Sequence, residues 1–262
     1  MSEPTVLNCL QDGVLAITLN RPAVLNALDF PATEALAQAI QAGKDDDAVR
    51  VVVRVVMIKD TGRGFCAGGD IKALWEHVQR GGSASHYLRD LTVLLHRITL
   101  DLRLMEKPVI AVINGTASGA GMSYVAACDI RLAGENARFK QAFTSIGLTP
   151  DSGWTTLVPL IVGSAKANEL LLFDPILDAK QALELGLVHE VVPGEALGKR
   201  AQELAIKLAR RPKSALGGAK ALLNASLLPT LESQLERERQ RIIIQAGSDE
   251  FIERLNAFVN RL

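Results

Sequence analysis

The chain has 262 residues, of which 48% are apolar and 22% are charged, and its 29 basic residues balance its 29 acidic ones. This length suits one large domain or a core with a smaller appendage, and the composition is ordinary for a globular protein. Balanced charge argues against a nucleic-acid-binding protein, which carries a basic field, and against an acidic disordered tail. No apolar run reaches the ~18 residues that a membrane span needs, so we expect a small molecule or another copy of the chain as partner.

The cysteines and the two ends of the chain indicate which cross-links, metal sites and targeting signals to expect. Cys9, Cys66 and Cys128 are far apart, odd in number and without metal-ligand spacing, so we expect neither a disulfide framework nor a metal site. The first residues show neither the basic nor the apolar region of a signal peptide. The last three are Asn-Arg-Leu rather than the peroxisomal Ser-Lys-Leu address. We therefore expect a cytoplasmic protein.

Strands and helices alternate in the first part of the chain. Residues 14–20 alternate in polarity and are rich in β-branched residues, which predicts a strand paired with residues 5–10. A helix is expected over 28–42, with Asp29 as its N-cap and Pro31 in its first turn. The acidic run Asp45–Asp47 predicts a solvated turn, and the apolar residues 51–58 predict a buried parallel strand. Helices follow over 71–79 and, after a glycine- and serine-rich break at 81–85, over about 87–105.

Strands and helices continue to alternate up to residue 195. Residues 109–113 predict a buried strand, and the small-residue run Thr116–Gly121 leads into a helix over 122–128. Further strands are expected from 129, over 137–143 and over 188–192, with helices over 154–162, 166–172 and 179–185. The chain from residue 195 onward shows only helical patterns. The sequence therefore predicts an α/β fold, with strand–strand–helix units over residues 1–195 and a helical region over 196–262.

Two glycine-rich loops each follow a buried strand, at Cys66–Asp70 and at Gly115–Gly121. Small residues at a strand-to-helix junction let a ligand approach unpaired N–H groups, which can stabilise a carbonyl oxygen that gains negative charge. Helix–strand packing that simply needs small residues explains the second loop equally well. A nucleotide site is disfavoured, because Tyr124 takes the place of the third glycine of a dinucleotide fingerprint and no Gly-Lys-Ser/Thr follows either loop.

Taken as a pair, the two loops resemble a known superfamily. FCAGGDIK and ASGAGMSYVAACDI, together with Asn-Arg-Pro and Asn-Ala-Leu near the start, closely resemble the crotonase (enoyl-CoA hydratase/isomerase) superfamily over essentially the full length. The resemblance implies a crotonase-like spiral of ββα turns and a C-terminal helical region that forms a homotrimer or a dimer of trimers. It also implies an acyl-CoA thioester as substrate, with coenzyme A as part of that substrate rather than as a separate cofactor.

The resemblance also implies the residues of the site. Two backbone N–H groups of the family hold the thioester oxygen, and by motif position they are those of Ala67 and Ala120. We expect Asp70 to act mainly as a helix N-cap. Lys213 and Lys220 either reach the coenzyme A phosphates of a neighbouring subunit or lie on a solvated helix face. The implied substrate contacts are Val24, Leu25, Ala67, Gly68, Gly69, Asp70, Ile71, Gly119, Ala120 and Phe143.

The carboxylates distinguish the reactions of the superfamily. Its hydratases carry two glutamates, whose places are taken here by Ser123 and Phe143, and neither side chain is an acid or base near neutral pH. The acidic residue left nearby is Asp151, in a PDSG segment that resembles the isomerases of phenylacetate degradation. Burial would raise its pKa and make it a better base, while the simpler role is to cap the next helix.

We therefore favour an isomerase in which Asp151 moves a proton, acting on 3-enoyl-CoA thioesters or on the ring-epoxide thioester 1,2-epoxyphenylacetyl-CoA. Three alternatives stay open at this point: an enoyl-CoA hydratase, an aryl-CoA dehalogenase with Asp151 as nucleophile, and a non-catalytic acyl-CoA binder.

Overall fold

The computed structural model describes residues 3–44 and 55–260. The predicted turn Asp45–Asp47 and residues 51–54 of the predicted strand lie outside this part of the chain. None of the described helices combines the length and the apolar run needed to cross a membrane.

The larger of two sheets has six strands in the order β1-β2-β3-β5-β7-β10. β1 (Val6–Gln11) and β2 (Val14–Leu19) form the predicted antiparallel hairpin. β3 (Val55–Asp60), β5 (Val109–Ile113), β7 (Ile130–Gly134) and β10 (Glu190–Val192) extend it in parallel. Every residue of β5 is buried, as expected for a central parallel strand with an unbroken apolar run.

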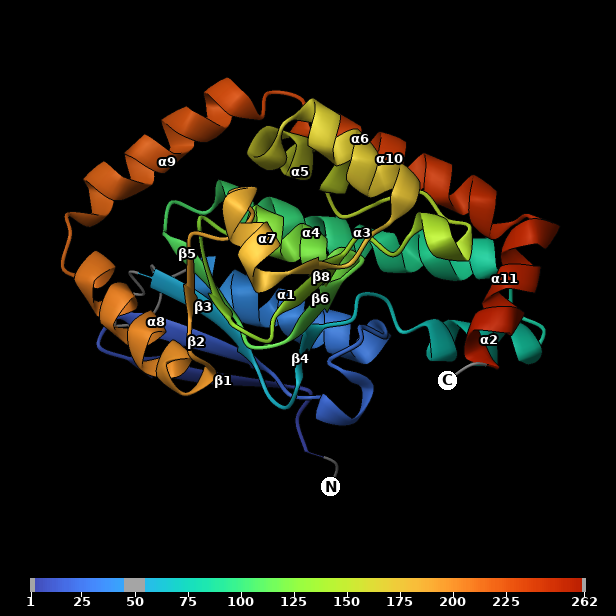
Figure 1. Ribbon diagram of the computed structural model, residues 1–262, viewed down its shortest axis with the longest axis horizontal. Helices are drawn as coiled ribbons and strands as arrows, with labels where there is room; N and C mark the ends of the chain where they lie inside the picture. Colours follow the sequence, from blue (N-terminus) through green and yellow to red (C-terminus); the bar gives the residue numbers. More distant parts are fainter. Residues whose placement is uncertain (1–2, 45–54, 261–262) are drawn as a thin grey trace.

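The smaller sheet contains one predicted strand, the one expected over 137–143, and three short strands that were not predicted. It consists of β4 (Gly64–Cys66), β6 (Thr116–Ser118), β8 (Arg138–Lys140) and β9 (Leu177–Asp178), in that order. β4, β6 and β8 each follow a strand of the larger sheet within a few residues, and helices carry the chain back. The chain thus passes from the larger sheet to the smaller one in each turn, which confirms the α/β class and the ββα spiral (Figure 1).

Two helices of the spiral begin at caps that the sequence predicts. The helices of the spiral are α1 (Phe30–Lys44), α2 (Ile71–Gln79), α3 (Ala84–Leu104), α4 (Ala120–Ala127), α5 (Trp154–Val162), α6 (Ser164–Phe173) and α7 (Ala179–Glu184). Asp29 and Asp70 accept hydrogen bonds from Ala32 N–H at 2.9 Å and Ala73 N–H at 3.0 Å, which confirms both predicted N-caps. α3 begins earlier than predicted because Ser83, inside the expected break, caps it.

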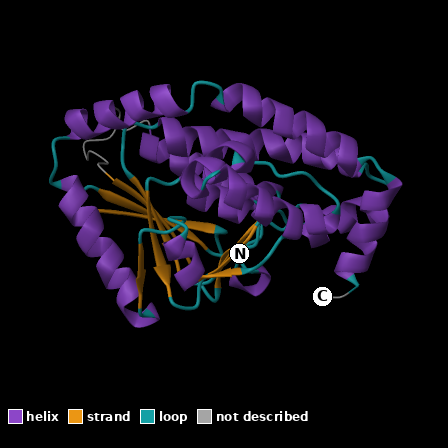
Figure 2. Cartoon of the chain, turned by 45° about the horizontal axis from the view of Figure 1, so that its top comes forward, coloured by secondary structure: helices purple, strands orange, loops and turns teal. Residues whose placement is uncertain are grey.

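Four helices end the chain: α8 (Gly194–Ala209), α9 (Lys213–Leu227), α10 (Leu231–Ala246) and α11 (Asp249–Val259). Figure 2 shows the strands with helices on both sides. α8 covers one face of the larger sheet, where Leu197 and Ala201 pack with Met57 and Ile110. α10 runs along α3 (Figure 1). The domain division at residue 195 stays a prediction, and α8 beyond it is part of the packing of the sheet.

Candidate active site

The first glycine-rich loop is joined to the N-terminal segment by a one-residue parallel bridge between Leu28 and Gly69. Leu28 N–H donates to Gly68 O at 2.8 Å, and Asp70 N–H donates to Leu28 O at 3.0 Å. In this pairing Leu28 uses its main-chain groups toward the loop, while Gly69 directs its own N–H to the opposite side. No described residue accepts the Gly69 N–H, so this amide is available to a ligand.

The structure corrects the assignment of Ala67 as the first oxyanion donor. Ala67 N–H donates to Leu25 O at 3.0 Å. This amide is therefore used inside the fold and is not available to a ligand. The physical reason is the pairing with the N-terminal segment, which takes up the amides of Ala67 and Asp70 and leaves the Gly69 amide on the other side.

The second loop brings the Ala120 amide next to this position. Ala120 is the first residue of α4, after Gly119 at φ 55°, and the first N–H groups of a helix have no partner within it. A Cβ atom at Gly68 would lie 3.2 Å from Ala120 N and 2.8 Å from Ser118 O. The two loops thus touch at a point where a side chain would collide, and no described residue accepts the Ala120 N–H.

Ion pairs hold the N-terminal segment against the first loop. The Arg21 guanidinium lies 2.8 Å from Asp29 Oδ2 and 3.2 Å from Asp70 Oδ2. Val24 ends the short 3-10 helix η1 (Pro22–Val24), and Leu25 follows in a left-handed conformation at φ 52°. The segment that bears Val24 and Leu25 therefore lies beside the first loop, and the substrate contacts that the resemblance implies for these residues and for Gly68–Ile71 stay a prediction.

Phe143 and Ser123 lie beside the second loop. A Cβ atom at Gly119 would lie 3.8 Å from Phe143 Cζ, so the ring borders this loop. Ser123 lies one turn after Ala120 on α4, and its buried hydroxyl donates to Asp151 O at 3.0 Å. The two positions expected to hold glutamates in a hydratase are thus at the site, and Asp151 is packed against one of them.

Asp151 is a buried carboxyl, 3% exposed. Burial raises its pKa to about 7, and the charge of Glu238 adds to that rise, whereas a hydrogen bond from Ser152 counters it. The Ser152 hydroxyl donates to Asp151 Oδ1 at 2.8 Å. A carboxyl that titrates near neutrality can both accept and return a proton under ordinary conditions.

The alternative role of Asp151, as the cap of the next helix, is wrong. α5 begins after Gly153 without a side-chain cap from its own segment. The N–H groups of Gly153 and Thr155 donate instead to the Glu238 carboxylate at 2.8 and 3.0 Å, and that of Trp154 donates to the main-chain oxygen of Asp151 at 3.1 Å. Sequence reasoning missed Glu238, because it lies 85 residues after Gly153 in a charged helical run that reads as a solvated face.

Lys220 has a structural role within the described chain. Its Nζ lies 2.7 Å from Asp129 Oδ2 and donates to Leu102 O at 2.9 Å and Lys107 O at 3.0 Å. Its side chain is 10% exposed, and burial lowers its pKa. These contacts join α9 to the end of α3 and to the start of β7, so this ammonium group is occupied inside the fold.

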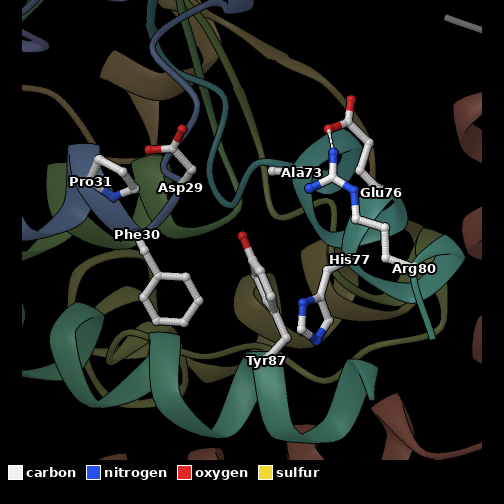
Figure 3. Close-up of a pocket in the computed structure, with 8 residues that line it drawn as sticks. All are labelled: Asp29, Phe30, Pro31, Ala73, Glu76, His77, Arg80 and Tyr87. Carbon is white, nitrogen blue, oxygen red and sulfur yellow. Dashed lines mark ion pairs between the residues drawn. The ribbon is translucent and has the colours of Figure 1, made fainter. Parts of the chain in front are cut away.

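A pocket of about 280 Å³ lies near the first loop, between the starts of α1 and α3 and the length of α2. Figure 3 shows Tyr87 between Phe30 and His77, with ring centroids 4.9 and 5.2 Å from that of Tyr87. The same pocket includes Asp29, which pairs with Arg21 on the side of the loop. Its lining contains none of the loop amides and not Asp151, so it is separate from the site described above.

The chain is similar to known proteins over nearly its whole length. The family model for enoyl-CoA hydratase/isomerase matches residues 10–262. The chain is 35% identical to 1,2-epoxyphenylacetyl-CoA isomerase of Escherichia coli, over 97% of this chain and 95% of that one. It is 33% identical to 2,3-dehydroadipyl-CoA hydratase of the same species, over 96% and 94%. A crystal structure of an enoyl-CoA hydratase from Mycobacterium avium subsp. paratuberculosis matches with a TM-score of 0.86, at 33% identity over 98% and 96%.

Proposed function

The chain belongs to the enoyl-CoA hydratase/isomerase family, and on that premise we propose that it is an acyl-CoA isomerase that works through an enolate. The observation that carries the proposal is the buried Asp151 carboxyl with its pKa of about 7. The main-chain oxygen of Asp151 accepts a hydrogen bond from the hydroxyl of Ser123, which stands at one of the two places where a hydratase of the family carries a glutamate. With Phe143 at the other place, a pair of acids for adding water is missing from these two positions.

The oxyanion hole is formed by the amides of Gly69 and Ala120. Both N–H groups are available, and they lie on loops in direct contact. Taking a proton from the carbon next to a thioester places negative charge on its oxygen. Preorganised donors stabilise that charge by roughly 3–4 kcal/mol each. Val24, Leu25, Gly68, Asp70, Ile71 and Gly119 line the path of the coenzyme A thioester toward this pair.

Asp151 then carries the proton. In a 3-enoyl-CoA its carboxylate removes a proton from C2, the electrons move to the thioester oxygen, and the carboxyl returns the proton to C4. The double bond ends between C2 and C3, and no atom is gained or lost. A base with a pKa of about 7 suits this role, since both of its protonation states are populated near neutral pH.

The acyl group is proposed from the named relatives. The isomerase from Escherichia coli acts on 1,2-epoxyphenylacetyl-CoA by its name, so ring-epoxide thioesters and 3-enoyl-CoA thioesters are the substrates that we propose first. The second candidate is a hydratase, which the names of other relatives at 33% identity favour. It would have to add water with Asp151 alone.

The test is to supply a 3-enoyl-CoA and crotonyl-CoA separately to the wild type and to Asp151→Asn. We expect the wild type to form the conjugated 2-enoyl-CoA from the first, little 3-hydroxy product from the second, and the variant to lose the isomerisation. Rapid formation of 3-hydroxybutyryl-CoA would favour the hydratase. An unchanged isomerisation rate in Asp151→Asn would remove Asp151 from the mechanism.

We also propose that the chain assembles into homotrimers or pairs of trimers. Large apolar side chains are exposed on its helical side and would be covered by other copies. They belong to α5, α6, α9, α10 and the segment after α6: Leu160, Leu172, Phe173, Ile176, Leu222, Leu223, Leu227 and Ile244. Light scattering on the purified protein should give a mass of three or six chains, and a monomer would contradict this part of the proposal.

A further inference from the structure

We propose that Glu238 of α10 is a positioning residue for Asp151: its carboxylate holds the turn that carries this acid, and its negative charge acts on it. The inference rests on the proposed function, because it takes Asp151 as the group that moves the proton. Glu238 would act through Asp151 rather than on the substrate.

Glu238 is an inward-facing carboxylate on a helix rich in charge. It is 4% exposed, whereas Glu232 on the same helix is exposed and Glu236 pairs with Arg239 near the surface. Burying a carboxylate is costly unless hydrogen bonds replace its water. A carboxylate buried on this helix therefore needs hydrogen-bond donors that offset the free-energy cost of its desolvation.

The partners of Glu238 all belong to the start of α5. Gly153 N–H donates to Oε2 at 2.8 Å, Thr155 N–H donates to Oε1 at 3.0 Å, and the Thr155 hydroxyl also donates to Oε1. Glu238 thus supplies, from a distant part of the chain, the N-terminal cap that α5 lacks in its own sequence. A negative charge is also favoured at this end of a helix.

The turn that bears Asp151 is held from three helices. Ser123 of α4 donates to Asp151 O at 3.0 Å, and Thr99 of α3 donates to Ser152 O at 2.9 Å. Glu238 of α10 binds the following amides. Ser152 has φ 57°, a left-handed conformation that is uncommon for a residue with a side chain. These bonds together keep the turn in that conformation, and with it the position of the acid.

Glu238 is also the charge that acts on Asp151. The other groups from the elements packed around this turn are hydroxyls, on Thr99, Ser123, Tyr124 and Ser152, and burial raises the pKa of the Tyr124 phenol well above its ordinary value. The hydroxyls therefore stay neutral. Glu238 raises the pKa of Asp151, because like charges disfavour ionisation.

The two carboxyls differ in their hydrogen bonds. Burial raises the pKa of Glu238 too, and the hydrogen bonds from Gly153 and Thr155 counter that rise. Glu238 accepts from two backbone N–H groups and a hydroxyl, whereas the Asp151 carboxyl accepts from the Ser152 hydroxyl, and hydrogen bonds to a carboxylate favour its charged form. Without the neighbouring charge, Asp151 would be a weaker base with a lower pKa.

The test compares Glu238→Gln with Glu232→Gln, an exposed position on the same helix, in the isomerisation of a 3-enoyl-CoA as a function of pH. In Glu238→Gln we expect the acid limb of kcat to move to lower pH, because a like charge is removed. On that limb the rate relative to its own plateau then rises, while the plateau falls. Glu232→Gln should retain the wild-type profile. An acid limb that stays in place in a folded Glu238→Gln protein would overturn the proposal.

A second variant and a direct titration cover the remaining cases. If Glu238→Gln does not fold, Glu238→Asp keeps the charge but shortens its reach, so we expect a reduced kcat and an acid limb close to that of the wild type. Wild-type kcat in that variant would contradict the positioning role. Carbon-13 NMR of the aspartate carboxyls, with Asp151→Asn for assignment, should show the Asp151 pKa falling in Glu238→Gln. That shift is measurable even if Asp151→Asn keeps full activity, so failure of the proposed function and failure of this inference are distinguishable.

Discussion

Replacing Asp151 by asparagine should stabilise the fold at alkaline pH while removing activity. The carboxyl is 3% exposed, and its pKa lies at about 7 instead of 3.8. Above pH 7 this group is ionised while buried in the folded protein. The ionised form is destabilised there relative to the unfolded chain, where the carboxylate is hydrated. Asparagine has nearly the same shape, and its Oδ1 can still accept the hydrogen bond from Ser152.

The magnitude follows from the linkage between protonation and folding. The folded pKa is raised, so the destabilisation is absent below pH 3.8, grows as the pH rises, and is complete above about pH 7. At about 1.4 kcal/mol per pH unit, the shift of Asp151 corresponds to a gain of at most about 4 kcal/mol for Asp151→Asn at pH 8. At pH 4 the two proteins should have nearly equal stability.

Urea unfolding at fixed protein concentration measures this difference, since the midpoint reports stability when the slope is unchanged. Asp90→Asn is a suitable control, because Asp90 is an exposed residue paired with Arg89 and should show no such gain. If Asp151→Asn is no more stable than the wild type at pH 8, Asp151 bears no burial cost, and the argument for its raised pKa fails.

Three further predictions concern the loops and a buried histidine. Ala120→Pro removes the N–H group at the first position of α4, a position at which a helix tolerates proline. It should lower kcat/KM by about 10²–10³. Ala120→Gly, which keeps the N–H group, should retain most activity in the same thioester assay. Gly68→Ala should destabilise the fold in thermal unfolding, because Gly68 has φ 87° and its Cβ would lie 2.8 Å from Ser118 O; Gly69→Ala, with nothing within 4 Å, should not. Burial lowers the pKa of His96 to about 4, so stability should fall by about 3 kcal/mol as the pH drops from 6.5 to 4, and His96→Leu should flatten this dependence in urea titrations.

The strands of the larger sheet could be predicted because they are apolar runs of useful length, as in Val109–Ile113. β4 and β6 could not, since three-residue strands inside glycine-rich loops show no periodicity. Both helix caps at Asp29 and Asp70 were readable, because an N-cap depends on residues close in the sequence. Features that depend on neighbouring residues, such as helix caps, could therefore be predicted. Short strands that pair with segments distant in the sequence could not.

The same division applies to the site. Asp151 could be found by asking which acid remains near the second loop. Ala67 was wrong because the direction of an amide depends on the bridge between Leu28 and Gly69, a pairing of segments about 40 residues apart in the sequence that leaves no local pattern. Glu238 was missed for the same reason, because its role depends on where α10 packs.

The buried thiol of Cys66 can report how often the two loops of the site separate. Its side chain lies between the first loop and the start of α4, where a Cβ at Gly121 would meet the Cys66 Cβ at 2.8 Å. Burial raises the pKa of its thiol to about 12. Alkylating reagents attack thiolates, so this sulfur should react only after the two loops separate. With the exposed Cys9 replaced by serine, the rate of Cys66 alkylation would measure how often the loops part, and a bound thioester would slow it.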